Sequence, residues 1–157
     1  MIVIAALPSV SPPALAGKQR DTLRLTWEGR RWTRKRVITT QGREVALALP
    51  TGTTLPVGSV LWVDADWYLE VEGAPEPVIA VRPHSHHQAL RVAFEVGNRH
   101  FTVAIAGEEL LVPDDTAMAQ LLDRLDVHWE RREAVYTPLG FGHRHDHGRG
   151  HGHGHDH

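Results

Sequence analysis

The 157-residue sequence contains no cysteine. This absence excludes disulfide bonds, thiolate zinc sites and iron–sulfur clusters, and it leaves the compartment undecided by redox chemistry. Any transition-metal site must therefore use imidazole, carboxylate, backbone or water ligands. Long apolar runs are also missing, since none approaches the roughly 20 residues that a membrane-spanning helix needs. The apolar start over residues 1–7 is short and lacks a leading positive charge, so we expect a first strand rather than a signal peptide, and a cytoplasmic protein without a membrane partner.

Neither sign of charge dominates the sequence. Seventeen Lys and Arg residues stand against nineteen Asp and Glu residues, and the net charge is −2 with the histidines neutral. Bulk charge therefore favours neither nucleic acid nor a membrane surface as a partner. The common catalytic motifs are absent as well, including Gly-x-Ser-x-Gly and a phosphate-binding glycine-rich loop with lysine. We expect a protein that is not an enzyme.

Short β-rich pieces make up the first region, residues 1–74. Apolar and small residues alternate in Val45 to Leu49, as on a strand with one buried face. Further strands are expected over residues 23–26, 36–40, 60–64 and 67–71, with turn residues such as Gln41-Gly42 and Pro50-Thr51-Gly52 between them. Strands at this spacing without a helical period predict a small β-barrel or sandwich domain.

The period changes in the second region, residues 75–137. Apolar residues at helical spacing predict a helix from Ser85 to Val96 that stops at Gly97-Asn98, and a second helix that Asp114 caps. The expected strands are residues 77–81, 101–105, 109–112 and 127–136. The order βαββαβ is the ferredoxin-like pattern, so the predicted fold class is α+β. A domain of about sixty residues has a thin core, which an oligomeric contact would reinforce.

The third region, residues 138–157, is the strongest chemical signal. Its histidines are His143, His145, His147, His151, His153, His155 and His157, interleaved with glycine, arginine and aspartate. Such a segment cannot bury enough apolar area to offset its ordering entropy, so we expect a flexible tail. Imidazole suits nickel, copper, zinc and cobalt, and the ligands must be neutral, so uptake should weaken as the pH falls through about 6.5. An engineered purification tag is the alternative, although such tags are normally uninterrupted histidine runs.

The other histidines carry weaker signals. His100 follows the predicted helix stop. A lone histidine at such a position is usually an exposed polar residue or a core residue. In a two-fold dimer, however, two copies of His100 can meet at the axis and share an ion. The cluster His84, His86 and His87 is either an ordinary exposed first turn or an auxiliary metal site. His128 has no companion and is expected to be structural or exposed.

A basic run with an aromatic residue inside it extends from Arg30 to Arg36. It is either a solvated strand face or a docking surface for an acidic protein partner. Nucleic acid is the remaining alternative, but no second basic patch supports it.

Taken together, these features resemble the UreE family of urease accessory proteins, which are nickel metallochaperones. The matching stretches are residues 21–30, Arg34-Lys35-Arg36, Thr40-Gln41-Gly42, residues 47–55, Gly97-Asn98-Arg99-His100, the Pro113-Asp114 helix start and the histidine-rich tail. The resemblance covers roughly residues 21–136 together with the tail.

The resemblance implies a function and a division of labour. Residues 1–74 would form a β-rich domain that contacts partner proteins or peptides, and residues 75–137 a ferredoxin-like domain that dimerises and binds metal. The family histidine that matches His100 contributes to a metal site from both subunits, and tail histidines join it. Ni(II) would then pass to apo-urease through the accessory GTPase complex, with Zn(II) or Cu(II) binding the same sites. The alternative is a nickel or zinc storage or detoxification protein without a dedicated client.

Overall fold

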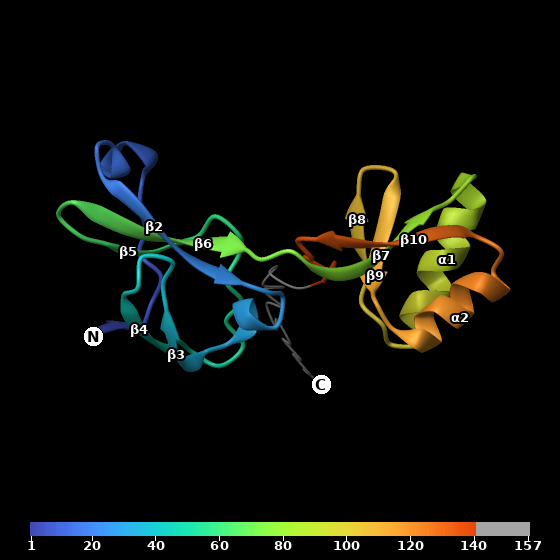
Figure 1. Ribbon diagram of the computed structural model, residues 1–157, viewed down its shortest axis with the longest axis horizontal. Coiled ribbons are helices and arrows are strands. Elements are labelled where there is room, and N and C mark those ends of the chain that lie inside the picture. Colours follow the sequence, from blue (N-terminus) through green and yellow to red (C-terminus); the bar gives the residue numbers. More distant parts are fainter. Residues whose placement is uncertain (141–157) are drawn as a thin grey trace, which may run out of the picture.

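The computed structural model describes residues 1–140, so the predicted tail histidines lie outside the described residues (Figure 1). Within this part the fold is mixed α+β, as predicted. The first half of the chain contains β1 (Ile2–Ile4), η1 (Pro12–Leu15), β2 (Gln19–Leu25), η2 (Gly29–Arg31), β3 (Arg34–Ile38), β4 (Glu44–Ala48), β5 (Val60–Val63) and β6 (Trp67–Gly73). The second half contains β7 (Glu76–Arg82), α1 (His86–Asn98), β8 (Ala104–Ala106), β9 (Glu109–Pro113), α2 (Thr116–Arg124) and β10 (His128–Ala134).

Two three-stranded sheets form the first half, in the orders β1-β4-β3 and β2-β6-β5. Strand β1 pairs with β4, and β2 with β6, in parallel, whereas the other two pairs are antiparallel. The alternation predicted in β4 is confirmed, because Val45 and Leu47 are buried in a core that also takes Leu23 and Leu69 from the other sheet. The sheets of residues 1–140 do not close into a barrel, so the barrel alternative is wrong.

The second half has the element order βαββαβ that the sequence predicts. Its sheet has the order β10-β7-β9-β8, and every neighbouring pair is antiparallel. Alternate residues of β7 point to opposite faces. Ile79 and Val81 share a core with residues of both helices, whereas Val78 and Ala80 belong to a separate cluster with Tyr136. Strand β7 is therefore buried on both faces.

The end of α1 differs from the prediction. The helix continues through Gly97 and Asn98, and the left-handed residue that ends it is His100, with φ 62°. The His100 amide donates to the Gly97 carbonyl at 3.0 Å, and the Phe101 amide to the Val96 carbonyl at 3.2 Å, which is the Schellman arrangement. Phe101 packs against the core that contains Val96. This tertiary contact, rather than the glycine, decides where the helix ends.

Two smaller predictions are also corrected. The N-cap of α2 is Asp115, whose carboxylate accepts a hydrogen bond from the Met118 amide at 3.1 Å. Asp114, the predicted cap, instead lies 3.3 Å from the guanidinium of Arg131. The strand expected from Phe101 begins only at Ala104, because the Phe101 amide bonds back to α1, whereas Thr102 and Val103 bond to residues that follow β10.

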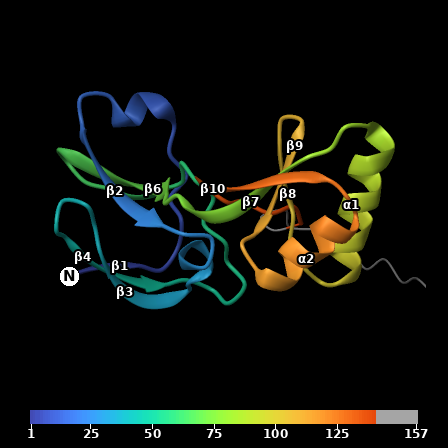
Figure 2. The same ribbon diagram turned by 45° about the vertical axis from the view of Figure 1, so that its right-hand side comes forward.

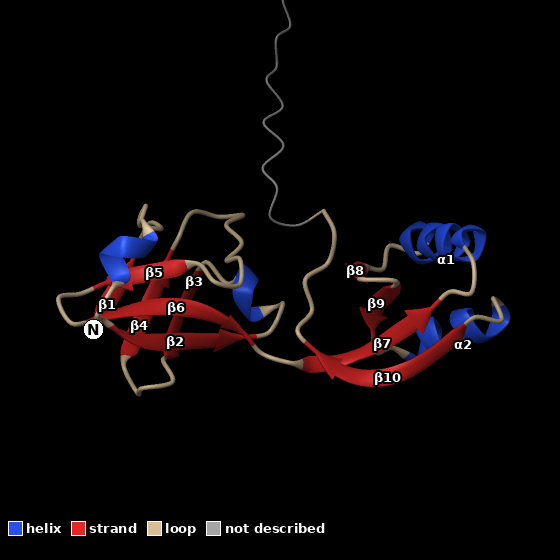
Figure 3. Cartoon of the chain, turned by 90° about the horizontal axis from the view of Figure 1, so that it is seen from above, coloured by secondary structure: helices blue, strands red, loops and turns tan. Residues whose placement is uncertain are grey.

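The two halves lie side by side, and the chain passes between them from β6 to β7 (Figures 1 and 2). Both α-helices lie at the end of the molecule away from the N-terminal sheets (Figure 3). A small apolar cluster around Tyr136 joins the halves, with Trp27 of the first half packed against it. Within residues 1–140, the helices are too short and too polar to span a bilayer.

Candidate metal centre

His100 is the one predicted ligand that the structure places. It follows the C-terminal end of α1, is exposed, and has a positive φ that is usually taken by Gly or Asn at this position. For a residue with a Cβ this conformation costs about 1–2 kcal/mol. An imidazole kept in a strained, exposed position is a reason to look for a binding role.

The surroundings of His100 do not complete a site within one chain. Among residues 1–140, no three side chains of His, Cys, Asp or Glu lie close enough together to hold a metal ion. The remaining predicted ligands, His143 to His157, lie outside the described residues. Within the described chain, the side chains around His100 therefore do not by themselves make a metal site.

An uncovered apolar face lies on the helix that leads to His100. Leu90 and Phe94 are 59% and 68% exposed and stand one turn apart, on the side of α1 away from the buried Val92 and Val96. We call Leu90 and Phe94 the α1 apolar face. The apolar spacing of the helix does not predict this face, although two large apolar residues outside the buried stripe are a signal of it in the sequence. Because the two side chains are neighbours on one helix side, this face is a candidate contact surface.

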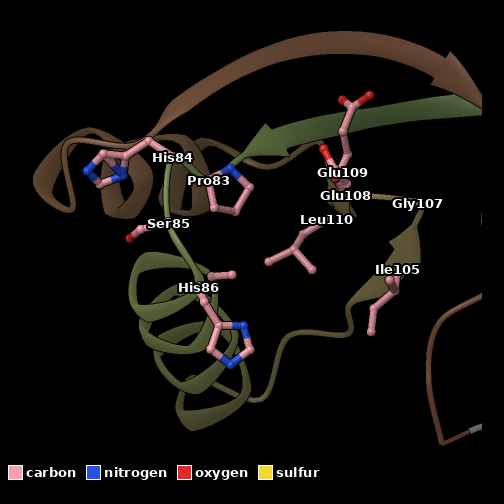
Figure 4. A pocket seen from close by; sticks show the side chains of 10 residues that line it. Pro83, His84, Ser85, His86, Ile105, Gly107, Glu108, Glu109 and Leu110 are labelled. Carbon is pink, nitrogen blue, oxygen red and sulfur yellow. The ribbon is translucent and has the colours of Figure 1, made fainter.

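The cluster at the start of α1 does not form an auxiliary metal site in the structure. The His84 ring is hydrogen-bonded to Gln88, with Nδ1 and Oε1 2.5 Å apart. A pocket of about 470 Å³ lies between the start of α1 and the β8–β9 hairpin. Figure 4 shows that the His84 and His86 rings point in different directions and not toward Glu108 or Glu109 across it. This arrangement agrees with the ordinary exposed first turn.

His128, at the start of β10, is exposed, which is one of the two placements expected for it. It has no role in a candidate site and serves as a matched control histidine.

The basic run divides into two parts. Arg34, Lys35 and Arg36 are exposed on β3, which fits a solvated strand face, and the Lys35 ammonium lies 3.8 Å from the centre of the Trp32 ring. Arg30 contradicts that interpretation, because it is only 1% exposed. Burial lowers the pKa of Arg30, and the nearby Glu76 carboxylate opposes this effect.

Comparisons with known proteins agree with this architecture. Residues 4–74 match the model for the N-terminal domain of the UreE urease accessory protein, and residues 76–157 match the model for its C-terminal domain. The chain is 34% identical over 116 residues to the urease accessory protein UreE of Lysinibacillus sphaericus, covering 74% of this chain and 78% of the relative. It is 34% identical over 131 residues to that of Cupriavidus necator (81% and 68%), and 33% identical over 141 residues to that of Burkholderia vietnamiensis (87% and 70%).

Proposed function

The chain belongs to the urease accessory protein UreE family, and we propose that it binds Ni(II) as a homodimer and delivers it to apo-urease through the accessory GTPase complex. Members of this family are accessory metallochaperones of urease maturation and not enzymes. Nickel is therefore the cargo of the protein, which must bind the ion and release it again.

His100 supports the dimeric site. It is an exposed imidazole in a strained conformation, at the end of a helix whose Leu90 and Phe94 are uncovered. In a two-fold dimer the same patch meets itself, so burial of the α1 apolar face would bring both His100 residues toward the axis. Imidazole nitrogens suit Ni(II), and exchangeable ligands suit a carrier.

We assign a role to each part of the chain. Residues 1–74 bind partner proteins, residues 75–137 form a ferredoxin-like domain that dimerises and holds the shared ion, and residues 138–157 hold further ions loosely. The strand order β10-β7-β9-β8 with two helices on the β7–β9 core supports the ferredoxin-like assignment. The tail histidines His143, His145, His147, His151, His153, His155 and His157 supply ligands to the shared site and to the loosely held ions.

Calorimetric titration with Ni(II) tests the assignment of the metal ligands. We expect His100→Ala to abolish the tight site, whereas the matched control His128→Ala keeps it. A chain that ends at Gly142 should keep a site at His100 and bind fewer ions in total. An unchanged tight site in His100→Ala would refute the shared site, and unchanged stoichiometry after truncation would refute the role of the tail.

Capture of the accessory GTPase tests delivery. We expect the full chain to retain the GTPase on a column in the presence of Ni(II). Absence of association with and without nickel would favour storage over delivery.

A further inference from the structure

The residues between β10 and the histidine-rich tail touch both halves of the molecule. We call residues 135–139 the tail root. Figure 3 shows this stretch leaving the end of β10 beside the junction of the two halves. Within it Tyr136 and Pro138 are buried, although the stretch belongs to no helix or strand. Buried irregular backbone needs hydrogen-bond partners, and these come from two directions.

On one side the tail root is held by Arg30 of η2. The Arg30 guanidinium donates through Nη2 to the Tyr136 carbonyl and through Nη1 to the Thr137 hydroxyl at 3.1 Å. Its Nε is the one buried side-chain nitrogen or oxygen without a partner in the described chain. A fully buried cation without a directly bonded carboxylate is costly to fold. Trp27 offsets part of this cost, since its ring centre is 5.5 Å from the guanidinium carbon.

On the other side the tail root is held by the loop that follows His100. The hydroxyl oxygens of Tyr136 and Thr102 are 2.7 Å apart. The Leu139 amide donates to the Val103 carbonyl at 2.8 Å. Thr102 and Val103 are only two and three residues after His100, so the loop that carries the candidate ligand also carries these contacts.

We propose that Arg30 and Tyr136 are positioning residues for nickel binding, because they hold the start of the histidine-rich tail on the His100 loop. This proposal rests on the proposed function of His100 and the tail. We call the contacts of Arg30 and Tyr136 with the tail root and the His100 loop the anchor. The anchor shortens the path from the folded domain to the first tail ligand and so raises the local concentration of tail imidazoles at His100. It also connects the first half of the chain, through Arg30, to the metal-binding region.

The expected size of the effect follows from chain length. His143 is four residues after Leu139 but nine residues after Ala134, the last residue of β10. The effective concentration of a tethered ligand falls with roughly the −3/2 power of tether length, so release of the tail root lowers it about three-fold. The change should appear in the contribution of the tail to nickel affinity and not in the site without the tail.

Two independent variants release the anchor. Arg30→Met removes the guanidinium but keeps an apolar side chain of similar length. The pair Thr102→Val with Tyr136→Phe removes both hydroxyl groups and leaves neither unpaired, so it is expected to fold even if Arg30→Met does not. Lys35→Met is the matched control, since Lys35 is an exposed cation on β3.

The hydrogen-exchange rate of the Leu139 amide shows whether the tail root is held in place, and this measurement needs no nickel. We expect at least a ten-fold faster exchange in both variants and no change in Lys35→Met. Unchanged protection of Leu139 in both variants would show that these contacts do not hold the tail root, whatever the role of His100.

Nickel titration reads out the positioning role. Each variant is compared in the full chain and in the chain that ends at Gly142. We expect an affinity loss of about three-fold in the full chain only. An equal loss in both backgrounds, or none in the full chain, would overturn the positioning role. A failure of the proposed function can be distinguished from a failure of the positioning role. In the first case His100→Ala would leave tight nickel binding unchanged, while the exchange rate of the Leu139 amide would still show that the tail root is held.

Discussion

At the scale of single residues, His100 shows how a local conformation and a candidate function compete. Its φ of 62° lies in the left-handed region, where a Cβ is unfavourable by about 1–2 kcal/mol. Glycine removes this cost but loses about 0.5–1 kcal/mol more backbone entropy on folding. Glycine is therefore the better residue for the fold, and histidine the better residue for a metal ligand.

The variant His100→Gly separates these two roles. We expect its free energy of unfolding to rise by about 0.5–1 kcal/mol, because the strain at the end of α1 is relieved. Nickel affinity at the tight site should fall as in His100→Ala. Urea denaturation of the metal-free protein and calorimetry provide the two measurements. A variant that is less stable than the wild type would contradict the strain at this position.

Asp21 on β2 is a buried carboxylate, and no local sequence pattern predicts its burial. It accepts hydrogen bonds from the Thr39 hydroxyl at 2.6 Å, the Arg43 guanidinium at 2.8 Å and the amides of Thr22 and Gln41. Burial alone would raise the pKa of Asp21, but these bonds together outweigh it and hold the pKa below its ordinary value. The network connects β2 to the turn between β3 and β4.

A lowered carboxyl pKa in the folded state stabilises the protein above the unfolded pKa of about 3.9, and this stability is lost as the pH falls through the folded pKa. We expect Asp21→Asn to lower the free energy of unfolding by about 1–3 kcal/mol near neutral pH and by less below pH 3. Urea denaturation at both pH values measures the difference. The exposed Asp66→Asn is the control, and a loss independent of pH would contradict the role of the charge.

At the scale of elements, α1 has two apolar sides with different partners. Val92 and Val96 are fully buried against the sheet, whereas Leu90 and Phe94 remain exposed. A helix of an isolated globular unit normally has one apolar stripe. The second stripe is the physical basis for the proposed dimer.

Phe94→Glu tests this contact. A carboxylate on each copy would repel its partner and remain unpaired in a buried interface, so we expect the protein to become monomeric at micromolar concentration. The helix content should be unchanged, because Phe94 does not contribute to the core. Sedimentation velocity and circular dichroism measure the two effects. Arg91→Glu changes an exposed residue of the same helix and should leave the assembly state unchanged; an unaltered assembly in Phe94→Glu would contradict the proposed interface.

At the scale of the whole molecule, the relative position of the two halves depends on close packing at their junction. A Cβ added to Gly73 would lie 2.5 Å from Cγ1 of Val135 and 3.2 Å from Cγ2 of Val57. Valine cannot move aside easily, because its χ1 angle is restricted. The absence of a side chain at the end of β6 therefore allows the tail root to pass beside the first half.

We expect Gly73→Ala to lower the free energy of unfolding by about 1–3 kcal/mol and to change the relative orientation of the halves. Urea denaturation and small-angle X-ray scattering measure these effects. Gly97→Ala is the control, since a Cβ there meets nothing within 4 Å and alanine should favour the helix by about 0.5–1 kcal/mol. Equal stability of Gly73→Ala and the wild type would show that the junction accommodates the methyl group.

The sequence predicted most elements because their signals are local. The alternation in β4, the apolar spacing of α1 and α2 and the order βαββαβ all follow from the neighbours of each residue along the chain. Ends of elements were less predictable. The sequence predicts that α1 stops at Gly97-Asn98, but the helix includes both residues, and the packing of Phe101 on the core makes His100 the left-handed residue that follows its end.

The sequence by itself determined the fold class, the division into a β-rich region, a βαββαβ region and a histidine-rich tail, and the metal-binding chemistry expected of that tail, because composition and periodicity carry this information. His100 became a candidate ligand only through the resemblance of Gly97-Asn98-Arg99-His100 to the family pattern. Only the tertiary structure decided that Arg30 is buried, that Leu90 and Phe94 face outward, and that the tail root lies on the His100 loop. These properties depend on contacts between residues far apart in the chain, such as Arg30 and Tyr136, which are 106 positions apart. No local pattern encodes such a contact, because it exists only when both halves have folded and met.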